Sequence, residues 1–369
     1  MMDIIVALYQ TVVSLFLFLY QEIYGFLHMD GILELFVYAK KGDFSSLQTW
    51  DGITSLLRQI WGIIFFLEVT GLLIKRKFKI GEDYRMPFFI SLFNSLIGRY
   101  ISIGVIAYCI GLCSPYAIFK AESSWYIFIY GYIVWEFAYY VYHWSSHNVR
   151  ILWCLHSVHH APKTMNLSVS GVRFFLELTY LFAVNVTICI LLGVPPVILA
   201  IIMSIDSIWG EMLHIGDNFL PNARFGFLGK LIITPSHHRV HHARNPLYLD
   251  TNYCVLLNVW DRLFGSYQPE EDDIKIEYGI SREMNSDSFL DVYFGEILDL
   301  CKDIIYAPTL KHKLLYIIMP PGWNHTGDHK TASMERQRFL DARQQEHREA
   351  NFQTVSQERS ANEESISTI

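Results

Sequence analysis

Long apolar segments alternate with short polar connections over the first two thirds of the chain. Four such segments precede residue 143, and each has about the length that a helix needs to cross a bilayer. They cover residues 3–27, 55–74, 87–113 and 125–142. We therefore predict four transmembrane helices. The first is expected to be a retained span, because it lacks the basic start and the small-residue cleavage site of a signal peptide.

A fifth apolar segment, at residues 174–212, is broken by the sequence Gly-Val-Pro-Pro at 193–196. Proline is poorly tolerated inside a helix, and this sequence is a strong turn signal. We therefore predict a membrane hairpin of two helices. The hairpin would return the chain to the side of the membrane that it left, so that residues 143–160 and 214–242 can meet on one face.

The last hundred residues differ in character. Residues 288–306 interleave apolar and acidic side chains, which predicts an amphipathic helix on the membrane surface or against the preceding domain. Residues 327–369 are rich in Gln, Glu, Arg and Ser, so we expect a disordered tail or a solvated helix. The predicted units are thus the spans at 1–142, a histidine-rich domain at 143–268, a cap at 269–326 and the tail.

Composition supports a membrane protein. Only 18% of the residues are charged, whereas soluble proteins contain about a quarter. The deficit is explained if several segments lie in lipid, where each charge is costly. The formal net charge of −7 argues against a nucleic-acid partner, which needs a basic protein face. The six cysteines include no C-x-x-C pair, so neither a disulfide framework nor a cysteine zinc site is indicated.

The basic residues indicate which side of the membrane carries the histidines. The connection at 75–85 contains five Lys or Arg residues, whereas the loop at 114–124 on the opposite side contains only Lys120. Lys40 and Lys41 weaken this contrast without reversing it. The positive-inside rule therefore predicts a cytoplasmic active site, in the endoplasmic reticulum or a bacterial inner membrane.

Ten of the fifteen histidines lie between residues 143 and 242, and most fall in patterned groups. The patterns are H-x-x-x-H at 143–147 and H-x-x-H-H at both 156–160 and 238–242. On a helix, positions i, i+3 and i+4 share a face, and neutral imidazole is the commonest side-chain metal ligand. We therefore predict a metal centre of two ions.

Two other interpretations use the same histidines. One is a membrane metal binder or transporter, and the other is a scaffold without bound metal. Transporters usually place polar ligands inside spans near the middle of the membrane. The histidine groups here follow the ends of apolar segments, which favours a catalytic domain that caps them.

The residues around these histidines resemble a known superfamily. The sequence TPSHHRVHH at 234–242, the pair NY at 252–253 and the sequence WDRLFG at 260–265 are typical of the integral-membrane fatty acid hydroxylase and sterol desaturase superfamily. The similarity covers about residues 136–268. Within the superfamily, NLS at 166–168, Arg173, YGI at 278–280 and PPGW at 320–323 are most similar to the alkylglycerol monooxygenases.

The resemblance implies two iron ions held by nine of the ten histidines. The implied ligands are His143, His147, His156, His159, His160, His214, His238, His241 and His242. His237 would point about 100° away from His238 on a helix, so a supporting role is expected. For Glu136 and Glu211 two roles are expected equally: orienting a ligand or holding a bound water, or serving as a hydrogen-bonded membrane carboxylate.

The resemblance also implies an activity, which is O₂-dependent hydroxylation of a membrane lipid. Hydroxylation beside an ether oxygen would release an aldehyde and cleave the ether bond of an alkylglycerol. Tetrahydrobiopterin or a separate reductase would supply electrons, and the sequence sets no oligomeric state. The alternative activity is that of a sterol or fatty-acyl hydroxylase or desaturase. The candidates for contact with a substrate or cofactor are Asn166, Arg173, Arg239 and Arg244. For each arginine, a solvated or structural role is the favoured alternative.

Overall fold

The fold is helical throughout the part of the chain that the computed structural model describes, which is residues 2–26, 40, 50–97 and 99–367. No β-strand occurs in these residues, so the all-α class is confirmed. The main helices are α1 (Met2–Phe26), α3 (Trp50–Ile74), α4 (Arg85–Ile97), α5 (Arg99–Cys113), α6 (Trp125–Asn148), α7 (Arg150–His160), α8 (Glu177–Leu191), α9 (Pro196–Met212), α10 (Pro235–His241), α11 (Val259–Phe264), α12 (Phe289–Tyr306), α13 (Leu310–Ile318) and α14 (Ala332–Ser367).

The apolar segments form helices. In residues 87–113, which were expected to form one span, the structure describes helix α4 up to residue 97 and helix α5 from residue 99, and residue 98 between them lies outside the described residues. Within the described residues, no helix is both long enough and apolar enough to qualify as a membrane crossing. The membrane spans stay a prediction.

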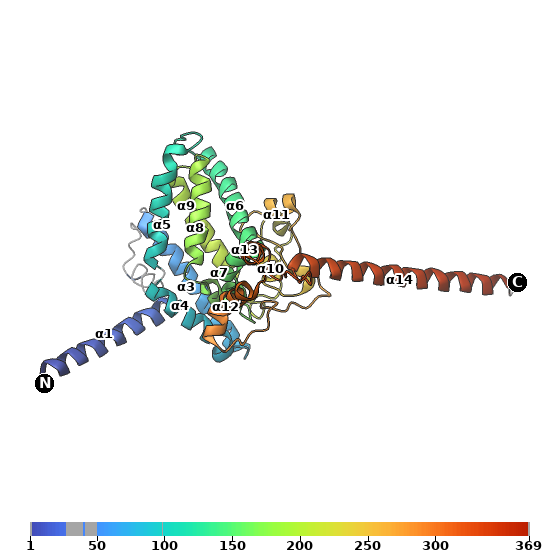
Figure 1. Cartoon of the computed structure of the whole chain (residues 1–369), viewed down its shortest axis with the longest axis horizontal. Coiled ribbons are helices and arrows are strands. Elements are labelled where there is room, and N and C mark those ends of the chain that lie inside the picture. Colours follow the sequence, from blue (N-terminus) through green and yellow to red (C-terminus); the bar gives the residue numbers. More distant parts are fainter. Residues whose placement is uncertain (1, 27–39, 41–49, 98, 368–369) are drawn as a thin grey trace.

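Helices α5, α6, α8 and α9 pack around a shared apolar core (Figure 1). The turn between α8 and α9 lies at the predicted Gly-Val-Pro-Pro sequence. Gly193 has φ +80°, and a Cβ there would lie 2.8 Å from the Phe119 carbonyl oxygen, so only glycine fits this position. The hairpin therefore returns the chain to the end of the bundle where α6 ends.

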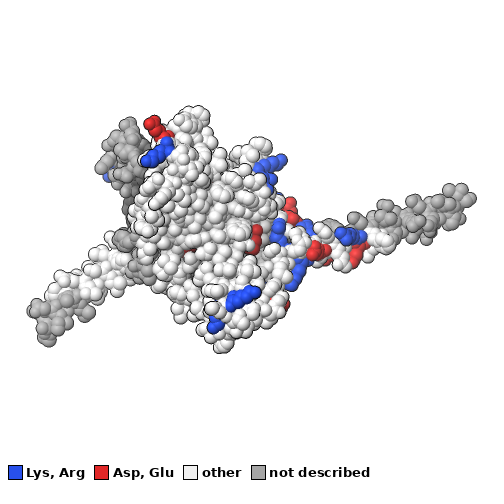
Figure 2. All heavy atoms as spheres, turned by 45° about the horizontal axis from the view of Figure 1, so that its top comes forward, with Lys and Arg blue, Asp and Glu red and all other residues white. Residues whose placement is uncertain are grey.

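The outward faces of α5 and α6 are apolar. Ile103 is 63% exposed, Tyr108 68% and Tyr126 59%. Figure 2 shows that the charged residues lie mostly at the edges of this view and that the bundle face carries few of them. Exposed apolar surface of this extent marks a place where lipid or another protein binds.

Helix α12 packs against α7 and α13, so the amphipathic segment contacts the histidine-bearing part of the fold. Arg150 at the start of α7 forms an ion pair with Glu296 of α12 at 3.3 Å. Both side chains are largely buried, which makes the pair more sensitive to the loss of one partner than a surface pair would be. Of the two expected positions for this helix, the structure thus favours the one against the preceding domain over the one on the membrane surface.

The polar C-terminal segment forms the helix α14, which extends away from the body (Figure 1). Its first turns contact the body. Arg336 donates from Nε to the Leu247 carbonyl at 2.8 Å and from Nη2 to Gln268 Oε1 at 2.9 Å. Phe339 and Leu340 pack on the apolar cluster that includes Val240. Of the two expectations for residues 327–369, the structure shows the helix.

Glu68, an acidic residue inside the second apolar segment, holds two distant segments together. Its Oε2 accepts from the Leu167 N–H at 2.9 Å, and its Oε1 accepts from the Gly216 N–H at 2.8 Å. The carboxylate is fully buried. Helix α3 is therefore fastened to two segments that flank the histidines.

Replacing this carboxylate should destabilise the fold. Glu68→Ala leaves two buried N–H groups without an acceptor, which should cost about 2–5 kcal/mol. Glu68→Gln should cost less, because its amide oxygen still accepts one of the two bonds. Thermal unfolding of the purified variants measures the difference, and an unchanged midpoint for Glu68→Ala would contradict the role given to Glu68.

Candidate metal centre

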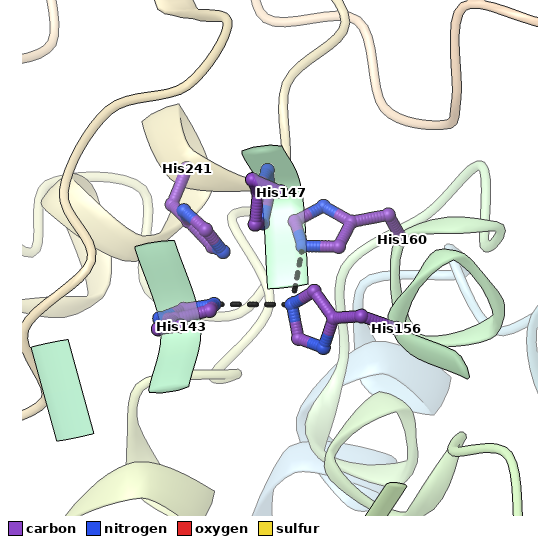
Figure 3. A group of neighbouring side chains, drawn as sticks. All are labelled: His143, His147, His156, His160 and His241. Carbon is purple, nitrogen blue, oxygen red and sulfur yellow. Dashed lines mark hydrogen bonds between the residues drawn. The ribbon is translucent and has the colours of Figure 1, made fainter. Parts of the chain in front are cut away.

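Four parts of the fold bring nine histidines together. Helix α6 carries two, α7 carries three, the turn after α9 carries one, and α10 with its C-cap carries three. The five-histidine group contains His143, His147, His156, His160 and His241 (Figure 3), and the four-histidine group contains His159, His214, His238 and His242. In each group, ligand nitrogens lie within 4.8 Å of one another. All nine side chains are buried.

Each H-x-x-H-H motif is divided between the two groups. His156 and His160 belong to the five-histidine group, whereas His159 belongs to the four-histidine group. The motif at 238–242 is divided in the opposite sense, with only His241 in the five-histidine group. Positions i and i+4 point the same way on a helix, while i+3 lies about 100° from i+4. The two groups are therefore interlocked: each contains histidines from both motifs, so neither group forms from one motif alone.

The imidazole nitrogens converge closely. In the five-histidine group, Nε2 of His156 lies 3.0 Å from Nε2 of His143 and 3.1 Å from Nε2 of His160 (Figure 3). In the four-histidine group, Nε2 of His214 lies 3.2 Å from Nε2 of His159 and 3.0 Å from Nε2 of His238. Such contacts need either a proton or a cation between the two nitrogens.

The hydrogen bonds at Nδ1, the other ring nitrogen, indicate whether a proton or a cation lies between two Nε2 atoms. Nδ1 of His143 donates to the Tyr253 carbonyl at 2.7 Å, and Nδ1 of His159 donates to the Val172 carbonyl at 3.0 Å. Nδ1 of His214 donates to the Gly210 carbonyl at 2.8 Å. A neutral imidazole with its proton on Nδ1 presents a lone pair at Nε2. These rings therefore aim lone pairs at common points, as metal ligands do.

Two further observations fit metal binding. Nε2 of His147 and Nε2 of His241 are buried and have no hydrogen-bond partner among the described residues. Burial, with neighbouring histidines adding to it, lowers the pKa of His160 and His242 well below the usual value. Burial and then the charge of Arg173 lower the pKa of His214 to about 3. Neutral imidazoles with unpaired nitrogens are the form that binds a metal ion.

One short loop orients three ligands of the five-histidine group. Asp250 Oδ1 accepts from Nδ1 of His147 at 3.2 Å, and the Thr251 carbonyl accepts from Nδ1 of His241 at 2.8 Å. The Tyr253 carbonyl orients the third, His143. The sequence reasoning did not identify Asp250, because 103 residues separate it from its histidine.

Two buried side chains hold this loop in shape. Asn252, with φ +58°, donates from Nδ2 to the His237 and Gln268 carbonyls at 3.1 and 2.7 Å. Its Oδ1 accepts from the Gln268 N–H at 2.9 Å. Asp261 accepts from the N–H groups of Tyr253 and the next residue at 2.8 and 2.9 Å. These contacts explain why the pair NY and the sequence WDRLFG occur together.

Glu177 supports a fourth ligand of the five-histidine group. Its Oε1 accepts from Nδ1 of His156 at 2.9 Å, from Arg173 at 2.6 Å and from the Tyr142 hydroxyl at 3.0 Å. The sequence reasoning missed Glu177, which lies in a segment expected to be in the membrane. An ionisable residue inside such a segment is a signal that could have identified it.

His237 lies outside both groups. Its Nδ1 accepts from the Thr234 N–H at 3.2 Å, and its Nε2 contacts the Tyr267 hydroxyl at 2.9 Å. These contacts form a capping box at the start of α10. The structure therefore gives His237 the task of starting the helix that carries the last three ligands.

The two predicted supporting glutamates have different positions. Glu136 is fully buried and accepts from the backbone N–H groups of residues 255–257, at 3.4, 2.9 and 3.2 Å. It holds the backbone and contacts no histidine in the described residues. Glu211 lies one turn before His214 at the end of α9, and its supporting role stays a prediction.

Three of the four predicted substrate contacts are engaged elsewhere. Asn166 caps a turn by accepting from the Ser168 N–H at 3.0 Å. Arg239 is buried and donates to the carbonyls of residues 215, 220 and 221. Arg244 forms an exposed ion pair with Glu277 at 3.3 Å. For Arg239 and Arg244 these contacts fit the structural or solvated role that was the favoured alternative, and contact of any of the three with a substrate stays a prediction.

A small cavity joins the two groups. It has a volume of about 20 Å³, which is enough for one small molecule of the size of water. Its lining comprises Tyr139, His143, His156, His159, Arg173, Gly210, Leu213, His214, His238, Cys254 and Val255. Burial raises the pKa of the Cys254 thiol well above its usual range, so the thiol stays protonated and is a poor metal ligand. Arg173 is the predicted substrate contact that the cavity includes.

Comparisons with known proteins match the region of the chain that contains the nine histidines. Residues 128–266 match the family model described as fatty acid hydroxylase. The alkylglycerol monooxygenase of Xenopus tropicalis is 31% identical over 190 residues, which are 51% of this chain and 40% of that protein. The alkylglycerol monooxygenase of Homo sapiens is 30% identical, with the same coverage of both chains.

A bacterial protein is also similar. The ornithine lipid hydroxylase OlsE of Rhizobium tropici is 28% identical over 150 residues, which are 40% of this chain and 44% of that protein. The chain thus spans less than half the length of these curated relatives. No solved structure matches it.

Asn252 should be essential to the shape of the loop that orients the ligands. Asn252→Ala removes three buried hydrogen bonds at a position of positive φ, so the free energy of unfolding should fall by about 2–5 kcal/mol. Asn252→Gly loses the same bonds but relieves the backbone, so it should be less damaging. Chemical unfolding of both variants tests this, and equal losses would show that the φ angle does not matter.

The lowered histidine pKa values should make metal binding insensitive to mild acid. Exposed histidines, with pKa about 6.5, are largely protonated at pH 6 and must release protons to bind a metal. Burial lowers the pKa of eight of these ligands below that range, so the affinity should hold from pH 8 to pH 6 and fall only as the pH approaches the lowered values. Calorimetric titration of metal-free protein with Zn²⁺ in two buffers measures the protons released. Release of several protons per ion at pH 6 would contradict the assignment.

Proposed function

Because residues 128–266 match the family model described as fatty acid hydroxylase, we propose that this protein is a membrane-bound lipid monooxygenase with a di-iron centre. The observation that carries the proposal is the convergence of nine buried imidazoles in two groups with a cavity between them. Iron bound there would supply the redox chemistry that activates O₂ and inserts one oxygen atom into a C–H bond. An all-imidazole ligand set suits iron.

The residues of this chain have distinct roles in the proposal. The nine histidines hold the ions, and the loop at 250–253 with Glu177 keeps their rings in the binding orientation. Tyr139 and Arg173 line the cavity as its polar side chains other than histidine. Leu213 and Val255 line the cavity with apolar side chains, which would help to exclude water. Exclusion of water strengthens every electrostatic interaction in the site.

The proposed substrate is a lipid with a long alkyl chain. Two of the relatives are named for alkylglycerols and one for ornithine lipid, and all three names denote enzymes that act on lipids. The cavity is too small for a chain in this conformation, so side chains such as Leu213 and Val255 must move when a chain enters. The apolar faces of α5 and α6 would contact the surrounding lipid, from which the chain would come.

A cytoplasmic location of the site is part of the proposal. Lys75 donates to the Asn218 carbonyl at 3.1 Å, and Lys77 donates to Asn218 Oδ1 at 3.0 Å. The basic connection therefore lies beside the segment that follows His214. This contact supports the argument from the positive-inside rule, because the basic residues and the histidines share one end of the bundle. The membrane is that of the endoplasmic reticulum or a bacterial cell.

A second candidate reaction is hydroxylation of a lipid chain without ether cleavage. The similarity to the ornithine lipid hydroxylase favours it, and sterol or fatty-acyl substrates fall in the same class. The electron donor would differ between the two candidates. Tetrahydrobiopterin would serve the ether-cleaving reaction, and a separate reductase would serve the other.

The assay that separates these reactions uses purified, iron-loaded protein in lipid vesicles with O₂. An alkylglycerol with tetrahydrobiopterin should yield a fatty aldehyde, whereas ornithine lipid or sterol with a reductase system should yield a hydroxylated product. His241→Ala should reduce turnover by at least about a hundredfold, because it removes a ligand. His312→Ala, a histidine outside both groups, should retain activity. Tightly bound iron without O₂-dependent turnover of any lipid would contradict the proposal and support a metal binder.

A further inference from the structure

The two histidine groups differ in what supports their ligands. In the five-histidine group, two rings donate to carboxylates, His147 to Asp250 at 3.2 Å and His156 to Glu177 at 2.9 Å. In the four-histidine group, the acceptors of His159 and His214 are backbone carbonyls, at 3.0 and 2.8 Å. The ligands of the two groups therefore differ in basicity, because an anionic acceptor makes an imidazole a stronger donor to a metal.

Arg173 is the cation beside the cavity, which its side chain lines together with histidines of both groups. Its Nη1 lies 2.6 Å from Glu177, so part of the Glu177 charge is offset. Asp250 has no such close cation among the ion pairs of the described residues, where its partner is His147. A cation beside a metal site opposes the binding of a second positive charge.

The number of ligands adds to this difference. One group offers five nitrogens and the other four. The cavity is lined by three of the four histidines in the smaller group, His159, His214 and His238, and by two of the five in the larger group. Metal sites with fewer protein ligands and an adjacent cavity keep a position open for a small molecule. The four-histidine group has this arrangement.

On the basis of the proposed metal centre, we propose that its two sites are unequal. The five-histidine group is the tight site, which fills first and releases its ion last, and Asp250 and Glu177 are the positioning residues that make it so. The four-histidine group is the exchangeable site, which exposes its ion to the cavity. The tight site holds the fold together around the ligands, while the exchangeable site is the one that small molecules reach.

The test uses full-length protein loaded with Co²⁺ and then treated with a chelator. The ions that remain are counted over time by elemental analysis, and the absorption bands of Co²⁺ report the coordination number of each. Wild-type protein should lose its two ions in separate fast and slow phases. Glu177→Gln and Asp250→Asn should each accelerate the slow phase by about 10–100-fold and leave the fast phase unchanged.

Matched variants separate positioning from general damage. Glu296→Gln changes another buried glutamate that pairs with arginine, at 3.3 Å from Arg150, and that has no histidine partner among the ion pairs of the described residues. It should leave both phases as in the wild type. His242→Ala should abolish the fast phase and leave the slow phase. Asp250 lies at the surface with 20% of its side chain exposed, so Asp250→Asn should fold even if Glu177→Gln does not.

Two results would overturn the inference and leave the proposed metal centre in place. One is the loss of both ions at one rate in the wild type. The other is acceleration of the fast phase by Glu177→Gln or Asp250→Asn. A protein that retains no Co²⁺ at all would instead reject the metal centre itself, and the inference with it.

Discussion

Convergent lone pairs impose the strongest constraint on this fold. Neutral imidazoles whose Nε2 atoms lie 3.0–3.2 Å apart repel one another unless a cation lies between them. In four of these rings, those of His143, His156, His159 and His214, an acceptor on the other side fixes the Nδ1 proton and the orientation. The acceptors are the carbonyls of Tyr253, Val172 and Gly210 and the carboxylate of Glu177 on helix α8, and Tyr253 belongs to a loop with two residues of positive φ, Asp250 and Asn252. Much of the structure around the site therefore keeps the histidine Nε2 atoms close together in their unprotonated form.

The interlocked motifs explain why the hairpin is needed. Each H-x-x-H-H motif gives a pair of ligands to one group and a single ligand to the other. Helix α7 and helix α10 must therefore face each other at a fixed distance, and the return of the chain through α8 and α9 makes this possible. Metal ions at both points would cross-link the two halves of the domain. Binding of metal and stability of this region are thus expected to be coupled.

The sequence was informative about residue types and poor about partners. Spacing selected eight of the nine histidines that the structure gathers, the family resemblance added His214, and the Gly-Val-Pro-Pro sequence located the hairpin turn. Spacing did not show that His159 and His241 each belong to a different group from the other two histidines of their motif. The prediction treats the histidines at i, i+3 and i+4 of a helix as pointing in one direction. Glu177 and Asp250 lie 21 and 103 residues from their histidines, so no local pattern connects them. Asn166 and Arg239 were expected at the substrate, but buried polar side chains serve backbone groups just as often.

The central claim is that the two histidine groups hold two iron ions, and diffraction data collected at the iron absorption edge test it most directly. Crystals of protein purified with iron should show two anomalous peaks, one enclosed by the five-histidine group and one by the four-histidine group. Nitrogen ligands should surround both peaks, with no sulfur ligand at either. A single peak, a peak outside the two groups, or a sulfur ligand from Cys254 would contradict the account.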